Sequence, residues 1–228
     1  MHNSKIPDYI KDRVVKRRGK LNIHEKIDTK STALLVIDMQ NCFIIPNLSL
    51  VEVPGVEAIA TNINKIAKTL RNNGGEVIWT KHRYTADWTT WYENFCNEKN
   101  RNQIIEDTKE GAFPGELWDG MDVQEDDKII TKNRSSALAP DFFLLKDYLS
   151  HKKIDTLIIT GTLSNVCCES TTRDAMFLNF KTIFVEDANG TRSDEEHNAT
   201  LINMIQFFAD AVSYTHLRAH ETPEHLGC

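Results

Sequence analysis

The chain has 228 residues, of which 40% are hydrophobic and 26% are charged, and its formal net charge is −6. Ten glycines and six prolines are too few for a fibrous or disordered chain, so we expect a globular protein. No apolar run approaches the roughly 20 residues of a membrane span, and the basic N-terminus lacks the apolar stretch of a secretory signal. Five cysteines without a C-x-x-C pair exclude a disulfide framework and a zinc cage. We therefore expect a cytoplasmic protein without a membrane partner.

The charge is unevenly distributed along the chain. Residues 1–30 contain nine basic and four acidic residues, a net charge of +5, so the remainder carries −11. The basic cluster at 16–20 is compatible with nucleic-acid binding, but no aromatic platform or groove-reading motif accompanies it. We expect residues 1–30 to form an arm that packs on the acidic body or on a neighbouring subunit, with no nucleic-acid partner.

From residue 31 onward, short apolar runs alternate with amphipathic segments. The apolar runs predict strands at 33–37, 76–80, 128–131, 156–160 and 182–185. The amphipathic segments predict helices at 56–70, 141–149, 166–178 and 194–208, the last beginning at a Ser193 cap signal. This alternation predicts an α/β fold: a doubly wound, mostly parallel, Rossmann-like sheet of about five or six strands, with helices on both faces. The long polar and aromatic connection at 82–125 is of a length that is usually functional.

Three reactive side chains follow three of the predicted strands: Asp38, Lys132 and Cys167. An aspartate, a lysine or a cysteine alone is more often a turn, surface or core residue. Parallel strands end at one edge of their sheet, however, so we expect these three side chains to meet there. At a helix start and beside Lys132, the pKa of Cys167 would be lowered, and Asp38 would transfer the thiol proton. Amides of the 161–167 turn would hold an oxyanion. The arrangement predicts acyl transfer through a thioester, without a metal or an organic cofactor.

The spacing of Cys167 and Arg173 allows a different chemistry, because C-x5-R is typical of cysteine-dependent phosphatases. The intervening residues contain no glycine and predict helical turns instead of a phosphate-binding loop. Arg173 is also placed to pair with Glu169, four residues earlier on the same helix. We therefore disfavour the phosphatase.

Four segments resemble the isochorismatase-like cysteine hydrolases, over about residues 7–211. They are VIDMQNCF (36–43), TKNRSSAL (131–138), GTLSNVCCESTTRDA (161–175) and FVEDANGTRSDEEHN (184–198). The resemblance implies a catalytic triad of Asp38, Lys132 and Cys167, with Cys168 as a buried helix residue. It also implies a cis peptide bond between Thr162 and Leu163, oxyanion donors at the amides of Leu163 and Cys167, and a homo-oligomer.

The resemblance also bears on the substrate. Nicotinamidases of this family carry an Asp-x-His metal motif after the second strand, where this chain has His82-Arg83-Tyr84, so we expect no metal and disfavour a nicotinamidase. Residues 7–28 resemble the corresponding segment of hydrolases of ureido or carbamoyl compounds, such as ureidoacrylate amidohydrolase. We therefore expect C–N cleavage in a small amide, ureido or carbamoyl compound. The alternatives are a vinyl ether hydrolase of the isochorismatase type and a catalytically silent binder; Cys167 argues against the first and the intact triad against the second.

Candidate substrate-binding residues flank the first two strands. They are Gln40, Asn41, Arg83, Tyr84 and Trp88, with Trp91 and Tyr92 as further lid candidates. For the aromatic and basic residues of the long connection, packing over the sheet edge is about equally compatible with the sequence.

The C-terminal segment departs from these patterns. Residues 212–228 contain three of the eight histidines, no apolar run and no periodicity. Within them, VSYTHLRAHET resembles a translated transposase adapter from sequencing-library preparation. We therefore expect a hydrolase domain at 31–211, a non-native tail at 212–228, and the loss of a last short strand.

Overall fold

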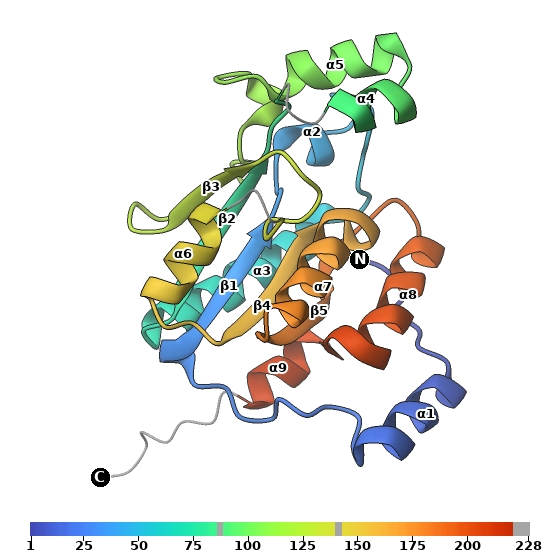
Figure 1. The fold of residues 1–228 in the computed structure, drawn as a ribbon, viewed down its shortest axis with the longest axis vertical. Coiled ribbons are helices and arrows are strands. Elements are labelled where there is room, and N and C mark those ends of the chain that lie inside the picture. The colour runs from blue at the N-terminus through green and yellow to red at the C-terminus, as the bar shows by residue number, and fades with distance from the viewer. Residues whose placement is uncertain (86–88, 140–142, 221–228) are drawn as a thin grey trace.

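A single parallel sheet organises the chain, as the computed structural model shows for residues 1–85, 89–139 and 143–220 (Figure 1). In the described residues its strand order is β3-β2-β1-β4-β5-β6, and every pairing is parallel. The strands are β1 (Thr32–Ile37), β2 (Glu76–His82), β3 (Lys128–Lys132), β4 (Thr156–Thr162), β5 (Lys181–Gly190) and β6 (Asp210–Val212). The predicted fold class is confirmed.

Helices cover both faces of this sheet. They are α1 (Asp8–Arg18), α2 (Asn41–Ile44), α3 (Val56–Asn72), α4 (Thr89–Phe95), α5 (Glu98–Thr108), α6 (Phe143–His151), α7 (Glu169–Phe177), α8 (Asp194–Asn203) and α9 (Tyr214–His220). Short turns of π-helix, Ser164–Cys168 and Met204–Phe208, precede α7 and follow α8. In the described part of the chain, no helix is long and apolar enough to cross a membrane.

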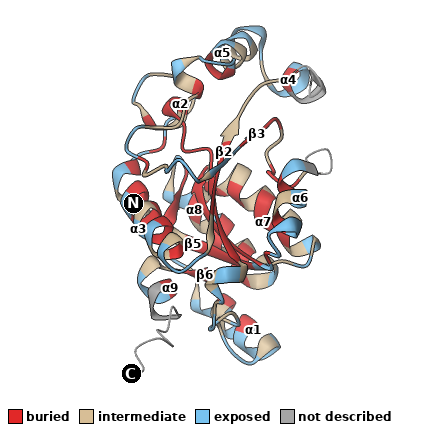
Figure 2. Ribbon diagram, turned by 90° about the vertical axis from the view of Figure 1, so that its left-hand side faces the viewer, coloured by how far each residue is buried: buried red, intermediate tan, exposed pale blue. Residues whose placement is uncertain are grey.

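Strand β1 lies between two hydrophobic cores, one on each face of the sheet. Ala33, Leu35 and Ile37 pack in the core shared with α1, α6, α7 and α8, whereas Leu34 and Val36 pack in the core shared with α3. Because both faces are covered, the run is apolar throughout and does not alternate. Figure 2 shows the buried residues gathered in the sheet and on the helix faces turned toward it.

The periodic helices agree with the sequence analysis. All six apolar residues that predicted α3 are buried, from Val56 to Leu70. At the start of α8, the Ser193 side chain accepts a hydrogen bond from the Glu196 amide, which is the predicted cap. The first two residues of the helix predicted at 141–149 lie outside the described residues.

The long connection after β2 contains two helices that the sequence analysis did not predict, α4 and α5. With α2 they lie beyond the carboxyl ends of β1 and β2 (Figure 1). Asn97 caps the start of α5, because its side chain accepts a hydrogen bond from the Asn100 amide. Its surface is mostly polar, and among its described residues only Asp107 and Thr108 are buried, so it lacks the apolar stripe on which a helix prediction depends.

The basic N-terminal segment packs on its own chain. Ile10 and Val14 of α1 are buried in the core with α7 and α8, and Arg18 forms an ion pair of 3.2 Å with the buried Asp210. The guanidinium of Arg17 lies 4.3 Å from the centre of the Phe207 ring. We expected residues 1–30 to pack either on the body of the chain or on a neighbouring subunit. The structure shows them packed on the body of the same chain.

The C-terminal segment also belongs to the packed structure, as far as residue 217. Strand β6 pairs with β5, and Val212 and Leu217 are buried in the core that contains α3. The amide of Tyr214 donates a hydrogen bond of 2.6 Å to Asp187. A last short strand is therefore present, and packed residues continue beyond 211, whereas the domain boundary at 211 stays a prediction. The non-native origin of 212–228 stays a prediction, and residues 221–228 lie outside the described residues.

Gly161 in β4 allows the closest approach of β1 and β4. Its φ is +113°, and a Cβ atom built there would lie 2.1 Å from the carbonyl oxygen of Ile37. We expect Gly161→Ala to lower the free energy of unfolding by about 3 kcal/mol or more, because the strands must separate. Urea denaturation measures this loss. Gly111→Ala is the control: its φ is +76° but nothing lies within 4 Å, so its cost should be about 1 kcal/mol.

Packing of the C-terminal segment can be tested at Leu217, which is 1% exposed. We expect Leu217→Ala to lower the free energy of unfolding by about 2 kcal/mol, because it leaves a cavity in the core. Thr215→Ala, on the exposed side of the same helix, should change it by less than about 0.5 kcal/mol. Equal values for the two variants in urea denaturation would contradict the packing of α9.

Candidate functional site

The sheet edge brings together the three side chains predicted to react. Asp38 follows β1, Lys132 is the last residue of β3, and Cys167 lies in the turn after β4. The Lys132 Nζ atom lies 2.6 Å from Asp38 Oδ2 and 3.4 Å from Cys167 Sγ. The side chains of Asp38 and Lys132 are fully buried. A buried carboxylate and a buried ammonium group thus lie beside a thiol that is partly exposed.

Neighbouring strands fix the orientation of Asp38. The Thr80 hydroxyl of β2 donates a hydrogen bond of 2.7 Å to Asp38 Oδ1 and accepts one from the Asp38 amide. From the other side, the Thr162 hydroxyl of β4 donates to the Asp38 carbonyl oxygen at 2.8 Å. These bonds hold Asp38 at a φ of +47°, a backbone conformation that few residues other than glycine adopt.

Lys132 reaches Asp38 across the intervening strand. In the sheet order β3-β2-β1, Lys132 pairs in register with His82 of β2, so its side chain extends over β2 toward β1. Its ammonium group also donates a hydrogen bond of 3.0 Å to the Arg134 carbonyl oxygen. The ammonium group therefore has three polar neighbours in fixed positions.

The turn that carries Cys167 begins at a cis peptide bond between Thr162 and Leu163, at the position that the family resemblance implied. The π-helical turn Ser164–Cys168 follows and leads into α7. Cys168 is fully buried, and its Sγ atom lies 3.9 Å from the Thr160 carbonyl oxygen, facing the sheet. Cys167, not Cys168, is thus the thiol that contacts Lys132.

The charges of this cluster set the protonation states. Burial lowers the pKa of Lys132, but the charge of Asp38 and the hydrogen bonds of the ammonium group to Asp38 and Cys167 outweigh it, so the pKa is raised and the ammonium form is retained. Burial raises the pKa of the Cys167 thiol to about 12; Lys132 opposes this shift and Asp38 adds to it. The predicted lowering of the thiol pKa is therefore wrong, because burial outweighs the ammonium charge. The resting thiol is protonated and needs a base to react.

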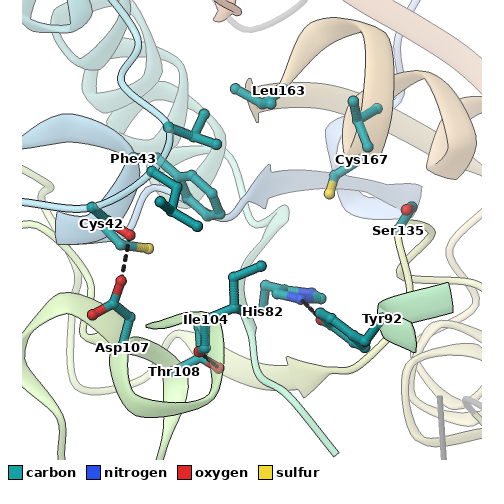
Figure 3. Close-up of a pocket in the computed structure, with 14 residues that line it drawn as sticks. Cys42, Phe43, His82, Tyr92, Ile104, Asp107, Thr108, Ser135, Leu163 and Cys167 are labelled. Atoms are coloured by element: carbon teal, nitrogen blue, oxygen red, sulfur yellow. Dashed lines mark hydrogen bonds between the residues drawn. The ribbon is translucent and has the colours of Figure 1, made fainter. Parts of the chain in front are cut away.

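A cavity of about 170 Å³ lies beside Cys167 (Figure 3). Its wall is mostly apolar, with a few polar groups, and it is built by the α2 region, the connection before α3, α4, α5 and the turn that carries Cys167. The lining residues are Cys42, Phe43, Ser49, Leu50, Val51, His82, Tyr92, Ile104, Asp107, Thr108, Ser135, Leu163, Val166 and Cys167. Such a mostly apolar cavity with few polar groups is typical of a small-molecule site.

The family resemblance places His82 where the metal branch has its first ligand. The His82 Nε2 atom lies 2.8 Å from the Tyr92 hydroxyl, and the two side chains lie next to each other in the wall of the cavity (Figure 3). Burial, followed by the charge of Lys132, lowers the pKa of His82 to about 4, so the ring is neutral at pH 7. Among the described residues, no group of three or more His, Cys, Asp or Glu side chains is placed to hold a metal ion.

Two of the predicted substrate-binding residues do not line the cavity, because their side chains form hydrogen bonds with the backbone. The Gln40 side chain donates to the carbonyl oxygens of Gly115 and His82 and accepts from the His82 amide. The Asn41 side chain donates to the Phe113 carbonyl oxygen at 2.8 Å. Because these amide groups are engaged with the backbone, they fix the segment around 113–116 over the sheet edge.

The other predicted substrate-binding residues lie at different places. Arg83 forms an ion pair of 2.9 Å with Glu110 and lines a separate hollow. Tyr84 does not line the cavity, and its ring packs edge-on against that of Tyr92, with 4.8 Å between centroids. Trp88 lies outside the described residues. Of the lid candidates with described side chains, Tyr92 lines the cavity and is 1% exposed.

Arg173 is part of the helix packing. Its guanidinium forms an ion pair of 2.6 Å with Glu169 and lies 4.0 Å from the centre of the Phe208 ring. Glu169 in turn accepts hydrogen bonds from Thr200 and Asn203 of α8. The helical pairing predicted from the sequence is confirmed, and the loop of a phosphatase is not formed.

Sequence reasoning missed several residues that shape the site. Thr80 has no signal beyond its place near the end of a strand. Asp107 belongs to a helix that was not predicted, although the spacing of Ile104, Asp107 and Thr108 at three and four residues places them on one face. Phe43 stands within a segment quoted for the family resemblance, but nothing in that segment marks it as part of a wall.

Comparisons with known proteins identify the family of this chain. A sequence model of the isochorismatase domain matches residues 32–215. Nicotinamidase 3 of Arabidopsis thaliana is 30% identical over 191 residues, which are 84% of this chain and 89% of that protein. A second Arabidopsis thaliana protein, described as a probable inactive nicotinamidase, is 31% identical over 179 residues, 77% of this chain and 88% of its own.

A solved structure supports the same assignment. The crystal structure of a cysteine hydrolase from Pseudomonas syringae pv. phaseolicola 1448A is similar with a TM-score of 0.73 and 25% identity, over 86% of this chain and 94% of that one. None of these three relatives is named as a ureidoacrylate amidohydrolase, so the branch predicted from residues 7–28 stays a prediction. Since the domain match covers most of the chain and includes Asp38, Lys132 and Cys167, the chain belongs to the isochorismatase-like family of cysteine hydrolases.

Proposed function

We propose that this protein is an amidohydrolase that cleaves the C–N bond of a small amide, ureido or carbamoyl compound through a thioester on Cys167. The observation that carries the proposal is the buried contact of Asp38, Lys132 and the Cys167 thiol beside a cavity of small-molecule character. The nicotinamidase relatives support amide hydrolysis, since an amide is the substrate that their name states.

The first half of the reaction acylates the enzyme. Asp38 takes the proton from the Cys167 thiol, and the sulfur attacks the carbonyl carbon of the substrate. Lys132 stabilises the thiolate that forms, because its ammonium group lies 3.4 Å from the sulfur. The amides of Leu163 and Cys167 donate hydrogen bonds to the oxyanion. The C–N bond then breaks, and the leaving nitrogen takes the proton from Asp38.

The second half releases the acyl group. Asp38 takes a proton from a water molecule, whose oxygen attacks the thioester carbonyl carbon. The C–S bond breaks, the acid leaves, and the proton held by Asp38 returns to the sulfur. The raised pKa of the resting thiol suits this cycle, because the nucleophile is created only when Asp38 accepts its proton.

A silent binder on the same scaffold remains the alternative to test, because one relative is described as probably inactive. In this chain the thiol, the carboxylate and the ammonium group are all present and in contact. A binding protein has no need of a nucleophile, so their retention supports hydrolysis. A vinyl ether hydrolase has no comparable use for the thiol.

The nucleophile can be tested by comparing two adjacent cysteines. We expect Cys167→Ala to lower ammonia release by about a thousandfold or more, because the bond-forming atom is lost. Cys168→Ala should retain most of the activity, since that thiol faces the sheet. The assay uses ureidoacrylate, biuret, nicotinamide and N-carbamoyl amino acids. The assignment is wrong if Cys167→Ala is active and mass spectrometry places the iodoacetamide adduct on Cys168 alone.

A metal requirement can be tested by chelation. With His82 engaged by Tyr92 and no metal-binding group among the described residues, we expect activity to survive extended dialysis against EDTA. The measurement is ammonia release before and after dialysis, with protein kept without chelator as the control. Loss of activity that zinc or manganese restores would show that the reaction depends on a metal.

A further inference from the structure

The wall of the cavity contains one carboxylate with no cationic partner. Of the described lining residues, Asp107 is the one acidic or basic side chain apart from His82. Asp107 is 5% exposed. Figure 3 shows Asp107 and Cys167 on opposite sides of the cavity. A carboxyl group therefore lies in the wall of the cavity on the side away from the Cys167 thiol.

The partners of Asp107 leave part of its hydrogen-bonding capacity open. Its carboxylate accepts hydrogen bonds from the Ser49 hydroxyl and from the Gln103 side chain at 2.7 Å, and both donors are neutral. Within the described part of the chain, no lysine, arginine or histidine forms an ion pair with it. A carboxylate accepts about four hydrogen bonds, so two positions remain for a ligand. A buried charge without a counter-charge is costly, and a cationic or N–H-bearing ligand would relieve that cost.

We propose that Asp107 is a specificity-determining residue that binds an ammonium or other N–H donor group of the substrate, at the end remote from the bond that is cleaved. This inference rests on the proposed amidohydrolase function and narrows its substrate class. The substrate is a short amide or ureido compound with a donor-bearing far end. Compounds with a carboxylate at that end are disfavoured, because two negative charges would share a cavity of low polarity.

The preference can be measured with three series of amides of the form X–(CH2)n–CO–NH2, with one to three methylene groups. X is an ammonium, a methyl or a carboxylate group, so that size is matched and charge differs. We expect kcat/KM for ammonia release to fall in the order ammonium, methyl, carboxylate, by about tenfold between the first two. An equal or reversed order in the wild-type protein would overturn the proposal.

Substitution separates specificity from a structural role of Asp107. Asp107→Asn keeps the volume; its oxygen can still accept from Gln103 and its NH2 group can donate to the Ser49 hydroxyl, but the carboxylate is lost. We expect it to lower the ammonium-to-methyl ratio of kcat/KM by about tenfold. A purely structural role would lower both values equally and leave the ratio unchanged. Glu106→Gln is the matched control, because that neighbouring carboxylate is exposed and pairs with Lys109, and its ratio should equal that of the wild type.

A binding measurement keeps this inference separate from the catalytic proposal. The rate at which iodoacetamide alkylates Cys167, followed by mass spectrometry, is measured with n-butylammonium, n-butanol or butyrate present. We expect butylammonium to protect Cys167 at the lowest concentration, and Asp107→Asn to abolish that advantage. If no amide is hydrolysed but this preference holds, the catalytic proposal fails and the role of Asp107 stands. Equal protection by the three compounds would overturn that role.

Discussion

The buried ion pair between Lys132 and Asp38 is the constraint on which the rest of the site depends. Two fully buried charges are tolerated only when geometry is good and the remaining hydrogen bonds are made. The Thr80 hydroxyl bonds to the carboxylate and the Arg134 carbonyl oxygen to the ammonium group, while Thr162 holds the backbone of Asp38. Removing one partner of such a pair typically costs about 3–5 kcal/mol, so the same contacts that prepare the chemistry also stabilise the edge of the sheet.

The fold and the reactive residues could be predicted because their signals are local. The apolar run of β1 and the three- and four-residue spacing in α3 each reflect one packing environment that repeats along the chain. The rule that parallel strands end together then placed Asp38, Lys132 and Cys167 at one edge without knowledge of the contacts. Parallel sheets convert positions far apart in the sequence into neighbours, and the sequence shows where each strand ends.

The environment of the reactive groups could not be predicted in the same way. The pKa of Cys167 depends on how much protein surrounds the thiol, and part of the wall of the neighbouring cavity comes from α4 and α5, two helices that the sequence analysis did not predict. Gln40 and Asn41 follow the catalytic strand, as substrate-binding residues often do, yet their side chains bond to the backbone of a distant segment. Long-range pairing of this kind leaves no periodic signal.

The position of Lys132 on β3 has a consequence for motion. In the described sheet β3 pairs only with β2, and its outer side is exposed, with Ile129 at 46%. Edge strands open locally at a lower free energy than central ones. Here any opening of β3 must withdraw the ammonium group and leave the carboxylate of Asp38 buried without its counter-charge. The ion pair therefore raises the free energy needed to open the edge strand. Slow amide hydrogen exchange in β3 then indicates that the contact between Lys132 and Asp38 is intact.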